Sequence, residues 1–477
     1  MFQRWSCGYL GYLDTKNFIM KNKFLLLTLL ILGAQALSAQ DLNWKELFNG
    51  KNFDGWTILN GKAKYHIEGD EIVGTSQLNT PNTFLTTDIM YSDFILEFEV
   101  MVDPSLNSGV QFRSNSIESY KDGRVHGYQC EIDPSSRAYS GGVYDEGRRG
   151  WLYPLSRNPK GRAAFNVSGW NSYRIEAIGP SIRIWVNGVN TTNMLDDKTA
   201  SGFIGLQVHG IGKKFQEGKQ IRWRNIRIAT ENLEYNRWAM DPDVVELNYL
   251  ANNLSEQEIR RGWRMLWDGK TTDGWRSAKS KTFPKNGWVV EDGQLIVLEG
   301  NGGEAENGGD IITEEKFSDF ELQLEFKITE GANSGIKYFV DPDINQGSGS
   351  SIGLEFQILD DKKHPDAKKG VKGNRTVGSL YDLIAATNLS IEGRSKTFRG
   401  VGEWNQARIV VQGNHVEHWL NGYKVVEYER KTPMFRALVN YSKYEKWPNF
   451  GELDQGHILL QDHGNRVAYR SIKIREF

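Results

Sequence analysis

Apolar and polar residues alternate in short runs along most of the chain, and each run ends near Gly, Asn, Asp or Pro. Such runs predict half-buried β-strands, because successive side chains of a strand point to opposite faces of a sheet. Many short strands without a βα rhythm favour an all-β sandwich or jelly roll. The clearest runs are FILEFEV (94–100), SGVQFR (108–113), GYQCEID (127–133), SYRIEAI (172–178), SIRIWVNG (181–188) and IRWRNIRI (221–228).

Seven segments of the first half return in the same order in the second half, which is the mark of an internal repeat. We therefore predict two tandem copies of one domain, over residues 41–230 and 263–477. The pairs are WKELFNGKNFDGW (44–56) with WRMLWDGKTTDGW (263–275), SDFILEFEV (92–100) with SDFELQLEF (318–326), NSGVQF (107–112) with NSGIKY (333–338), WNSYRI (170–175) with WNQARI (404–409), VNG (186–188) with LNG (420–422), GFIGLQVHG (202–210) with GHILLQDHG (456–464), and WRNIRI (223–228) with YRSIKI (469–474).

Two segments depart from the strand pattern. In residues 231–262, Ser255 and Glu258 have the spacing of a capping box and predict a short helix, so we interpret this segment as a helical linker. Within residues 1–40, a basic start at Met20 is followed by an apolar run and small residues, which predicts a signal peptide cleaved near 38–40. A membrane anchor is the alternative, but the run is short and no stop-transfer flank follows. Residues 1–19 are interpreted as an upstream mis-start, and the mature protein as secreted or periplasmic without an anchor.

Composition narrows the function classes. The 58 Lys and Arg balance 60 Asp and Glu, a net charge of −2, which disfavours a nucleic-acid partner. The two cysteines, Cys7 and Cys130, cannot form a structural zinc site or a disulfide framework. His364, His415 and His418 lack ligand spacing, so we predict no cofactor; a divalent metal is an alternative without support from spacing.

Strand alternation assigns a polar face to each copy. Tyr128, Cys130 and Ile132 are expected in the core, and so are their second-copy counterparts. The outward set would then carry an acid, amides, a cation and an imidazole in both copies. Such a face is by default the solvated side of a sandwich, and shared descent alone would repeat it. The expected outward residues are Gln111, Arg113, Gln129, Glu131, Asp133, Gln207 and His209, and then Lys337 (taken as the counterpart of Arg113), Glu355, Gln357, Gln461 and His463.

Gly-rich turns precede a Tyr-Asp pair in each copy, Tyr144-Asp145 and Tyr381-Asp382. The tyrosines could donate a proton or stack on a sugar, or they could only anchor a turn. Arg148, Arg149 and Trp151 could form a cleft wall or a solvated loop. These glycines lack the strand-to-helix context of a phosphate loop, so nucleotide binding is not expected.

Glu131 and Asp133 resemble part of the acidic strand of laminarinase-type glucanases. A retaining glycosidase needs two carboxyl groups about 5–5.5 Å apart. The third acid of that motif is replaced by Ser136, and the second copy has Leu359 where Asp133 would be repeated. An ordinary retaining glycosidase is therefore kept only as an alternative.

A set of segments from both copies resembles the 3-keto-disaccharide hydrolase domain, formerly a domain of unknown function. These segments are LFNGKNFDGW, GYQCEID, GGVYDE and LQVHG in the first copy and GLEFQILDD, GSLYDL, HWLNGYKVVEY and LLQDHGNRVAYRSIKI in the second. The resemblance covers about 42–230 and 262–477. It implies concanavalin A-like jelly rolls of exported bacterial proteins, often from Bacteroidetes, that cleave glycosides whose glucose ring carries a C3 ketone. Their partner would be a carbohydrate substrate.

Matching positions carry the family's roles onto this sequence. A C3 ketone acidifies the C2 proton, so a base, an acid and an enolate stabiliser would suffice for elimination and rehydration. The two steps together give hydrolysis, and an enzyme that performs only one of them would be a lyase or a hydratase. On the matching strand face, the first copy has Gln129 and Glu131 where the second has Glu355 and Gln357. The acid is thus shifted by two positions along the strand, so equal activity of the copies is not expected. The residues predicted as catalytic are Glu131, Tyr144, His209 and Arg113 in the first copy and Glu355, Gln357, Tyr381, His463 and Lys337 in the second; those predicted to bind substrate are Gln129, Gln207, Gln461, Arg148, Trp151, Asp145 and Asp382.

A non-catalytic protein is the competing hypothesis. Jelly rolls also host lectins, and two copies would raise avidity for a polysaccharide.

Overall fold

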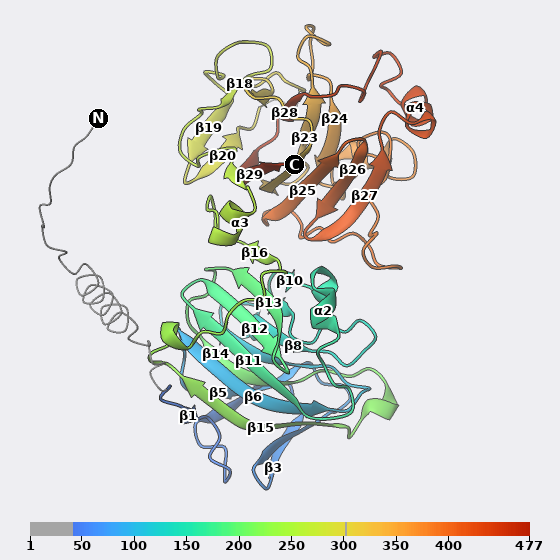
Figure 1. Ribbon diagram of the computed structural model, residues 1–477. Helices are drawn as coiled ribbons and strands as arrows, with labels where there is room; N and C mark the ends of the chain where they lie inside the picture. The colour runs from blue at the N-terminus through green and yellow to red at the C-terminus, as the bar shows by residue number, and fades with distance from the viewer. Residues whose placement is uncertain (1–41, 301–302) are drawn as a thin grey trace, which may run out of the picture.

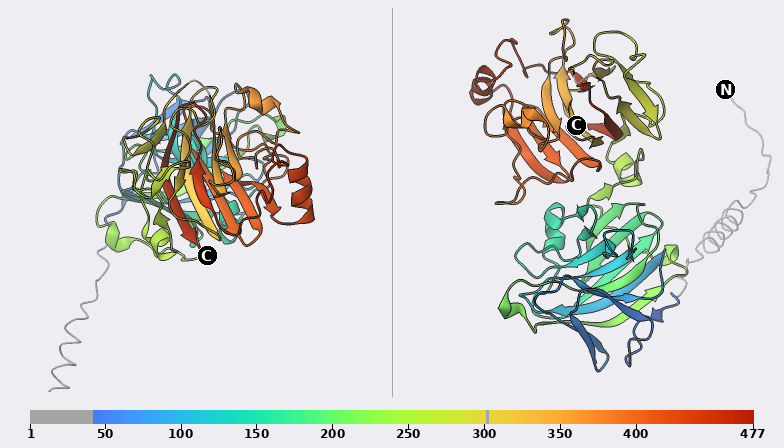
Figure 2. Two further views of the ribbon diagram at one scale, coloured as in Figure 1. Left: turned by 90° about the horizontal axis from the view of Figure 1, so that it is seen from above. Right: turned by 180° about the vertical axis from the view of Figure 1, so that it is seen from behind.

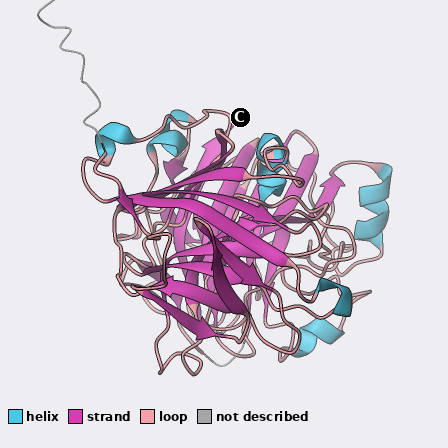
Figure 3. Cartoon of the chain, turned by 90° about the horizontal axis from the view of Figure 1, so that it is seen from below, coloured by secondary structure: helices cyan, strands magenta, loops and turns pink. Residues whose placement is uncertain are grey.

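The computed structural model describes residues 42–300 and 303–477. The predicted signal peptide, the start at Met20 and Cys7 lie outside the described residues. Two β-rich domains are stacked one above the other, and a segment that carries β16 and α3 joins them (Figure 1). The view from behind shows the same stacking (Figure 2). Strands fill the interior of both domains and helices stay at the periphery (Figure 3).

The N-terminal domain is a sandwich of two mostly antiparallel sheets. In the described residues, one sheet has nine strands and the other seven. The first runs β16 (Glu246–Asn248), β13 (Val189–Leu195), β12 (Ser181–Val186), β11 (Asn171–Ile178), β6 (Phe94–Val102), β15 (Gln220–Ala229), β4 (Glu71–Thr75) and β3 (Lys64–Glu68), with β1 (Lys45–Glu46) beside β15. The second runs β10 (Gly150–Tyr153), β9 (Val143–Glu146), β8 (His126–Ile132), β7 (Ser108–Asn115), β14 (Phe203–Val208), β5 (Thr83–Thr87) and β2 (Trp56–Asn60).

The C-terminal domain repeats this plan, so the predicted tandem all-β jelly rolls of concanavalin A-like type are confirmed. Its described residues form sheets of eight and five strands. The larger runs β19 (Trp288–Glu291), β20 (Gln294–Val297), β29 (Val467–Glu476), β22 (Phe320–Ile328), β25 (Asn405–Gln412), β26 (His415–Leu420) and β27 (Tyr423–Glu429), with β17 (Arg264–Met265) beside β29. The smaller runs β18 (Trp275–Ser277), β21 (Ile311–Thr313), β28 (His457–Leu460), β23 (Asn333–Val340) and β24 (Leu354–Leu359).

The core of each sandwich follows the predicted alternation. Tyr128, Cys130 and Ile132 are fully buried in the first domain's core, and Phe356 and Ile358 are fully buried in the second. Apolar side chains from both sheets meet there and are removed from water, which is the main stabilising contribution to such a sandwich.

Short helices occupy loops and the segment between the domains. Ser255 caps α3 and forms the predicted capping box with Glu258. The same segment adds β16 in parallel to β13, so it belongs to the first domain's sheet as well as being a linker. The helices are η1 (Leu155–Arg157), α2 (Pro159–Arg162), η2 (Lys214–Gln216), η3 (Glu234–Asn236), α3 (Glu256–Arg260), η4 (Pro365–Lys368) and α4 (Pro433–Asn440). Among residues 42–300 and 303–477, none of the helices has the length and apolar character needed to cross a membrane.

One irregularity recurs in both domains. The pairing of β7 shifts register between Phe112 and Asn115, and Arg113 there has a φ of 45°. In β23 the register shifts between Lys337 and Val340, and Phe339 has a φ of 52°. Left-handed backbone at a bulge rotates a side chain away from the alternating pattern.

Candidate functional site

A cavity of about 660 Å³ opens on the outer face of the seven-stranded sheet of the first domain. Side chains of β8, β9 and β14 meet loop residues there. The acid, most of the amides and the imidazole predicted to face outward from this sheet therefore do so. The predicted residues that line it are Gln129, Glu131, Asp133, Tyr144, Trp151, Gln207 and His209.

Glu131 is the buried acid of this cavity, with 4% of its surface exposed. Its Oε1 accepts hydrogen bonds from Asn107 Nδ2 at 2.8 Å and Arg137 Nη2 at 3.0 Å. Burial raises the pKa of Glu131 to about 7, although the bond from Asn107 and the charge of Arg137 act in the opposite direction. A carboxyl with a pKa near neutral pH can act as a general base there.

A chain of amides fixes the other carboxylate oxygen. Gln129 Oε1 accepts hydrogen bonds from Gln111 at 2.6 Å and Gln207 at 2.8 Å. Its Nε2 is therefore turned toward Glu131 Oε2, 2.9 Å away. The Oε1 atom of Gln207 is buried and has no hydrogen-bond partner among the described residues. It can accept a hydrogen bond from a ligand hydroxyl.

Aromatic side chains form one wall of the cavity. Tyr144 and Trp151 meet edge to face with ring centroids 5.2 Å apart, and Tyr139 also meets Trp151 edge to face, at 5.0 Å. His209 lies exposed at the cavity, and its Nδ1 lies 2.7 Å from the carbonyl oxygen of Gly210. Because a carbonyl oxygen only accepts, Nδ1 is the donor of this bond, and Nε2 is the ring nitrogen left for other contacts.

Arg113 does not lie on this face, so its prediction as an outward residue is wrong. The bulge of β7 turns it into the domain, where it is fully buried. Its guanidinium donates to Ser92 O at 2.6 Å, Gly179 O at 2.7 Å and Asp93 Oδ1 at 2.8 Å. Arg113 thus joins loops at the far edge of the sheets.

Asp145 and Arg148 do not line the cavity either, contrary to the prediction that they bind substrate. Asp145 follows Tyr144 in β9 and so points to the opposite face. It is fully buried and accepts from Arg148 at 2.7 Å and Arg149 at 2.5 Å. The Arg148 guanidinium also donates to Thr199 Oγ1 at 2.6 Å. Asp145 and the half-buried Arg148 and Arg149 thus form an ionic cluster on the opposite side of the strand from the cavity.

The second domain has a smaller cavity of about 180 Å³ on the corresponding face. It contains an acid, amides, a tyrosine and an imidazole at the predicted positions. The predicted residues that line it are Glu355, Gln357, Tyr381, Gln461 and His463, and they are joined by Glu304, Asn333, His364, Asp366, Lys369 and Lys443.

Glu355 is the buried acid of the second cavity. Burial raises its pKa, while Lys337 and Lys443 lower it by their charge. The Gln357 amide, with its nitrogen turned toward the acid, donates to Glu355 Oε1 at 3.2 Å and to Ser334 O at 3.0 Å. The carboxylate and amide have therefore exchanged places relative to Gln129 and Glu131.

Strand pairing corrects the expected counterpart of Lys337. Gln111 pairs with Gln129 in the first domain, and Lys337 pairs with Glu355 in the second, so Lys337 corresponds to Gln111. The counterpart of Arg113 is Phe339 at the second bulge. Lys337 is buried beneath Glu355, bonds Ser350 and Ser351 O, and does not line the cavity.

The remaining predicted residues of the second domain divide in two groups. Tyr381 lines the cavity and donates its hydroxyl hydrogen to Asp366 at 2.7 Å. His463 lies 6.1 Å from His364 between ring centroids, and its Nδ1 is buried without a hydrogen-bond partner in the described chain. Asp382 instead accepts from Arg375 at 2.7 Å and the Lys443 backbone at 2.8 Å, outside the lining.

Sequence reasoning missed several cavity residues. Asn107 and Asn333 begin the repeated NSG segments, so the repeat itself carried a signal for them. Arg137 and Lys443 lie in loops that do not match between the copies, and no local pattern marks them. Lys443 Nζ lies 4.2 Å from the centroid of Tyr381, and burial lowers its pKa.

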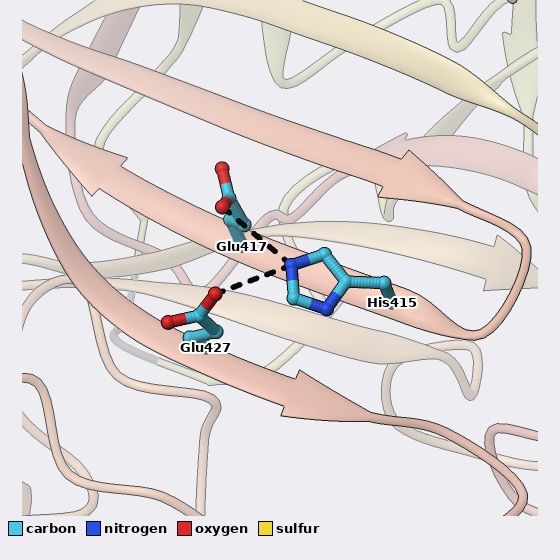
Figure 4. Close-up of side chains that lie close together, drawn as sticks. All are labelled: His415, Glu417 and Glu427. Carbon is cyan, nitrogen blue, oxygen red and sulfur yellow. Dashed lines mark ion pairs between the residues drawn. The ribbon is translucent and has the colours of Figure 1, made fainter.

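His415 lies in a different cluster from the cavities. It sits with Glu417 and Glu427 on neighbouring strands β26 and β27 (Figure 4), and their ligand atoms lie within 4.8 Å of one another. Lys424 Nζ already pairs with Glu417 at 2.6 Å and Glu427 at 3.0 Å. His418 is buried in the core, where desolvation lowers its pKa to about 4.

The chain matches the family described as the 3-keto-alpha-glucoside-1,2-lyase-like domain over residues 43–229 and again over 262–475. The 3-keto-disaccharide hydrolase of Bacteroides thetaiotaomicron is 37% identical over 234 residues, which are 45% of this chain and 78% of that protein. A candidate glycosyl hydrolase structure from Parabacteroides distasonis is 27% identical with a TM-score of 0.40, covering 48% of this chain and all of that one. A second from the same organism is 25% identical with a TM-score of 0.34, covering 45% and 99%.

Proposed function

Since this chain belongs to the 3-keto-alpha-glucoside-1,2-lyase-like domain family, we propose that this carbohydrate hydrolase cleaves 3-keto-glycosides, with 3-keto-disaccharides as its natural substrates. One observation carries the proposal. Each domain buries a carboxyl group of raised pKa, Glu131 or Glu355, in a cavity that also holds a histidine.

The residues present suit an elimination followed by addition of water. Glu131 or Glu355 removes the C2 proton, and the C2 electrons form an enolate with the C3 ketone. The enolate then expels the C1 oxygen, which takes a proton from His209 or His463. Water adds to C1 and a proton returns to C2, so atoms balance as a hydrolysis. The ketone is already in the substrate, so these steps need no redox cofactor.

Binding and charge stabilisation come from the surrounding groups. The unpartnered Oε1 atoms of Gln207 and Gln461 can accept hydrogen bonds from sugar hydroxyls. Trp151 and Tyr144 offer aromatic surface for a sugar ring. In the second cavity, Lys443 takes the enolate-stabilising role first expected for Lys337, because Lys443 lines the cavity and Lys337 does not.

The two sites are proposed to differ in rate and substrate size. The first cavity has about 660 Å³ and the second about 180 Å³. A disaccharide fits more readily in the first. The cation beside each acid also differs: Arg137 reaches Glu131 from a loop at 3.0 Å, and Lys337 faces Glu355 from the neighbouring strand at 3.8 Å.

The test measures release of free sugar from a 3-keto-disaccharide and from its unoxidised parent. Each domain is the matched control of the other: E131Q should remove the first activity, E355Q the second, and the double variant both. Full activity in the double variant would contradict the assignment of the bases.

Release from the unoxidised parent would favour the alternative, an ordinary glycosidase. Its one supporting observation is that Arg137 bridges Glu131 and Asp133, at 3.0 and 2.7 Å, in the same cavity.

We also propose that the protein is exported through the segment that begins at Met20. Cell fractionation and N-terminal sequencing of the mature protein test this. A cytoplasmic protein with residues 20–40 retained would contradict it.

A further inference from the structure

The first cavity includes one residue from the second domain. Arg394 lines it, whereas every other lining residue comes from the first domain. Arg394 lies in the loop between β24 and β25, and a loop of the upper domain descends toward the side of the lower domain that carries α2 (Figures 1 and 2). The smaller cavity has no such contribution among the described residues.

The loop around Arg394 is held in place by its own domain. Lys396 Nζ bonds Val377 O at 2.8 Å and pairs with Asp361 at 2.8 Å. Asn421 Nδ2 donates to Thr397 O at 2.8 Å, and the Leu389 backbone donates to Lys424 O at 2.9 Å. Arg394 therefore projects from an anchored segment.

The two domains are also fixed against each other near this point. The Arg157 guanidinium from the first domain lies 5.9 Å from the Trp419 ring and packs against Gly422, where a Cβ would come within 2.9 Å of Nη2. Farther along the interface, the linker residue Asn252 exchanges hydrogen bonds with Ser471 at 3.1 and 2.7 Å. The Lys473 ammonium pairs with Glu258 of α3. These contacts hold the Arg394 loop at the cavity.

Arg394 differs from the other arginines of the cavity in lacking a partner. Arg124 pairs with Glu146 at 2.9 Å, and Arg137 pairs with Glu131 and Asp133. Within the described chain, the side chain of Arg394 makes no hydrogen bond or ion pair, and it is exposed. Its five N–H donors are free for oxygen atoms of a ligand.

We propose that Arg394 is a substrate-binding residue of the first domain's site, and that it binds hydroxyl oxygens of the leaving sugar unit. This role rests on the proposed function. The keto ring must place C1 and C2 near Glu131 and His209. The second sugar then extends from the buried acid toward the exposed rim, where Arg394 lies.

The experiment compares two substrates in the E355Q protein, which isolates the first site. R394A should raise KM for a 3-keto-disaccharide about tenfold, the effect of losing one charge-assisted hydrogen bond. It should leave KM for methyl 3-keto-glucoside unchanged, because that substrate has no second sugar. R394K should recover part of the effect. E392Q, on the same exposed loop and outside the lining, is the matched control.

A binding titration separates this inference from the proposed function. In the E131Q/E355Q protein, R394A should weaken binding of the unoxidised disaccharide about tenfold with an unchanged melting temperature. If the wild type turns over neither substrate, the proposed function fails and the titration still tests Arg394. Equal effects on both substrates, or unchanged affinity in the titration, would overturn the role of Arg394.

Discussion

Lys337 and Glu355 face each other on the paired strands β23 and β24, with Nζ 3.8 Å from Oε2. Gln111 and Gln129 fill the same two positions of the first domain and bond at 2.6 Å. An amide pair in one repeat is thus a charge pair in the other. Lys337 offsets part of the cost of burying the Glu355 carboxylate, since a buried charge without a partner is costly.

Replacing Lys337 should therefore destabilise the second domain. K337Q leaves Glu355 buried without its nearest cation, and we expect a loss of about 3 kcal/mol in the free energy of unfolding at pH 8. The double variant K337Q/E355Q recreates the Gln111–Gln129 pair and should recover most of the lost free energy of unfolding. Urea unfolding measures both. A K337Q protein as stable as wild type would contradict the coupling.

The first site should depend on pH through Glu131. Its pKa is raised to about 7 by burial, so the carboxyl is protonated below that pH and cannot accept the C2 proton. In the E355Q protein, kcat/KM should rise with pH and level off above about 8. The charge of Arg137 lowers this pKa, so R137Q should shift the rising limb to higher pH. If kcat/KM rose with pH around a midpoint below pH 5 in both proteins, Glu131 would be ruled out as the base.

Arg113 should affect stability and not catalysis. R113M removes the three hydrogen bonds that the buried guanidinium makes to Ser92, Gly179 and Asp93. We expect a loss of about 3 kcal/mol. The folded fraction should keep the kcat and KM of the wild type at low temperature. Loss of kcat with an unchanged melting temperature would return Arg113 to the active site.

Chelation should leave both activities unchanged, because the acid and the base proposed for each site, and the Lys443 cation proposed for the second, are side chains of this protein. Dialysis against EDTA followed by the sugar-release assay measures this. Activity that disappears and returns on addition of one divalent metal would contradict the proposed division of roles.

Alternation along β8 and β24 was enough to predict the buried acids and their amide neighbours. It failed at Arg113, because a bulge in β7 interrupts the period of two. The same alternation, applied to β9, would have separated Tyr144 from Asp145. Arg137 and Arg394 could not be found this way, because their positions depend on loop paths and, for Arg394, on the packing of two domains.

The glycine of each NSG segment has a definite structural role. A Cβ at Gly335 would lie 3.0 Å from Cγ of Glu355 and closer still to its carboxyl group. G335A should therefore displace the base without straining the backbone, because no positive φ is required there. A displacement of about 1 Å can lower kcat about 100-fold.

The assay uses the E131Q protein, so that only the second site is active. G347A is the matched control, because its Cβ would meet only Asn345 Oδ1 at 3.4 Å. The control should keep full activity, and G335A should lose activity while its melting temperature changes little. If G335A retained the kcat of its parent, the position of Glu355 would not matter for the reaction, and its role as the base would fail.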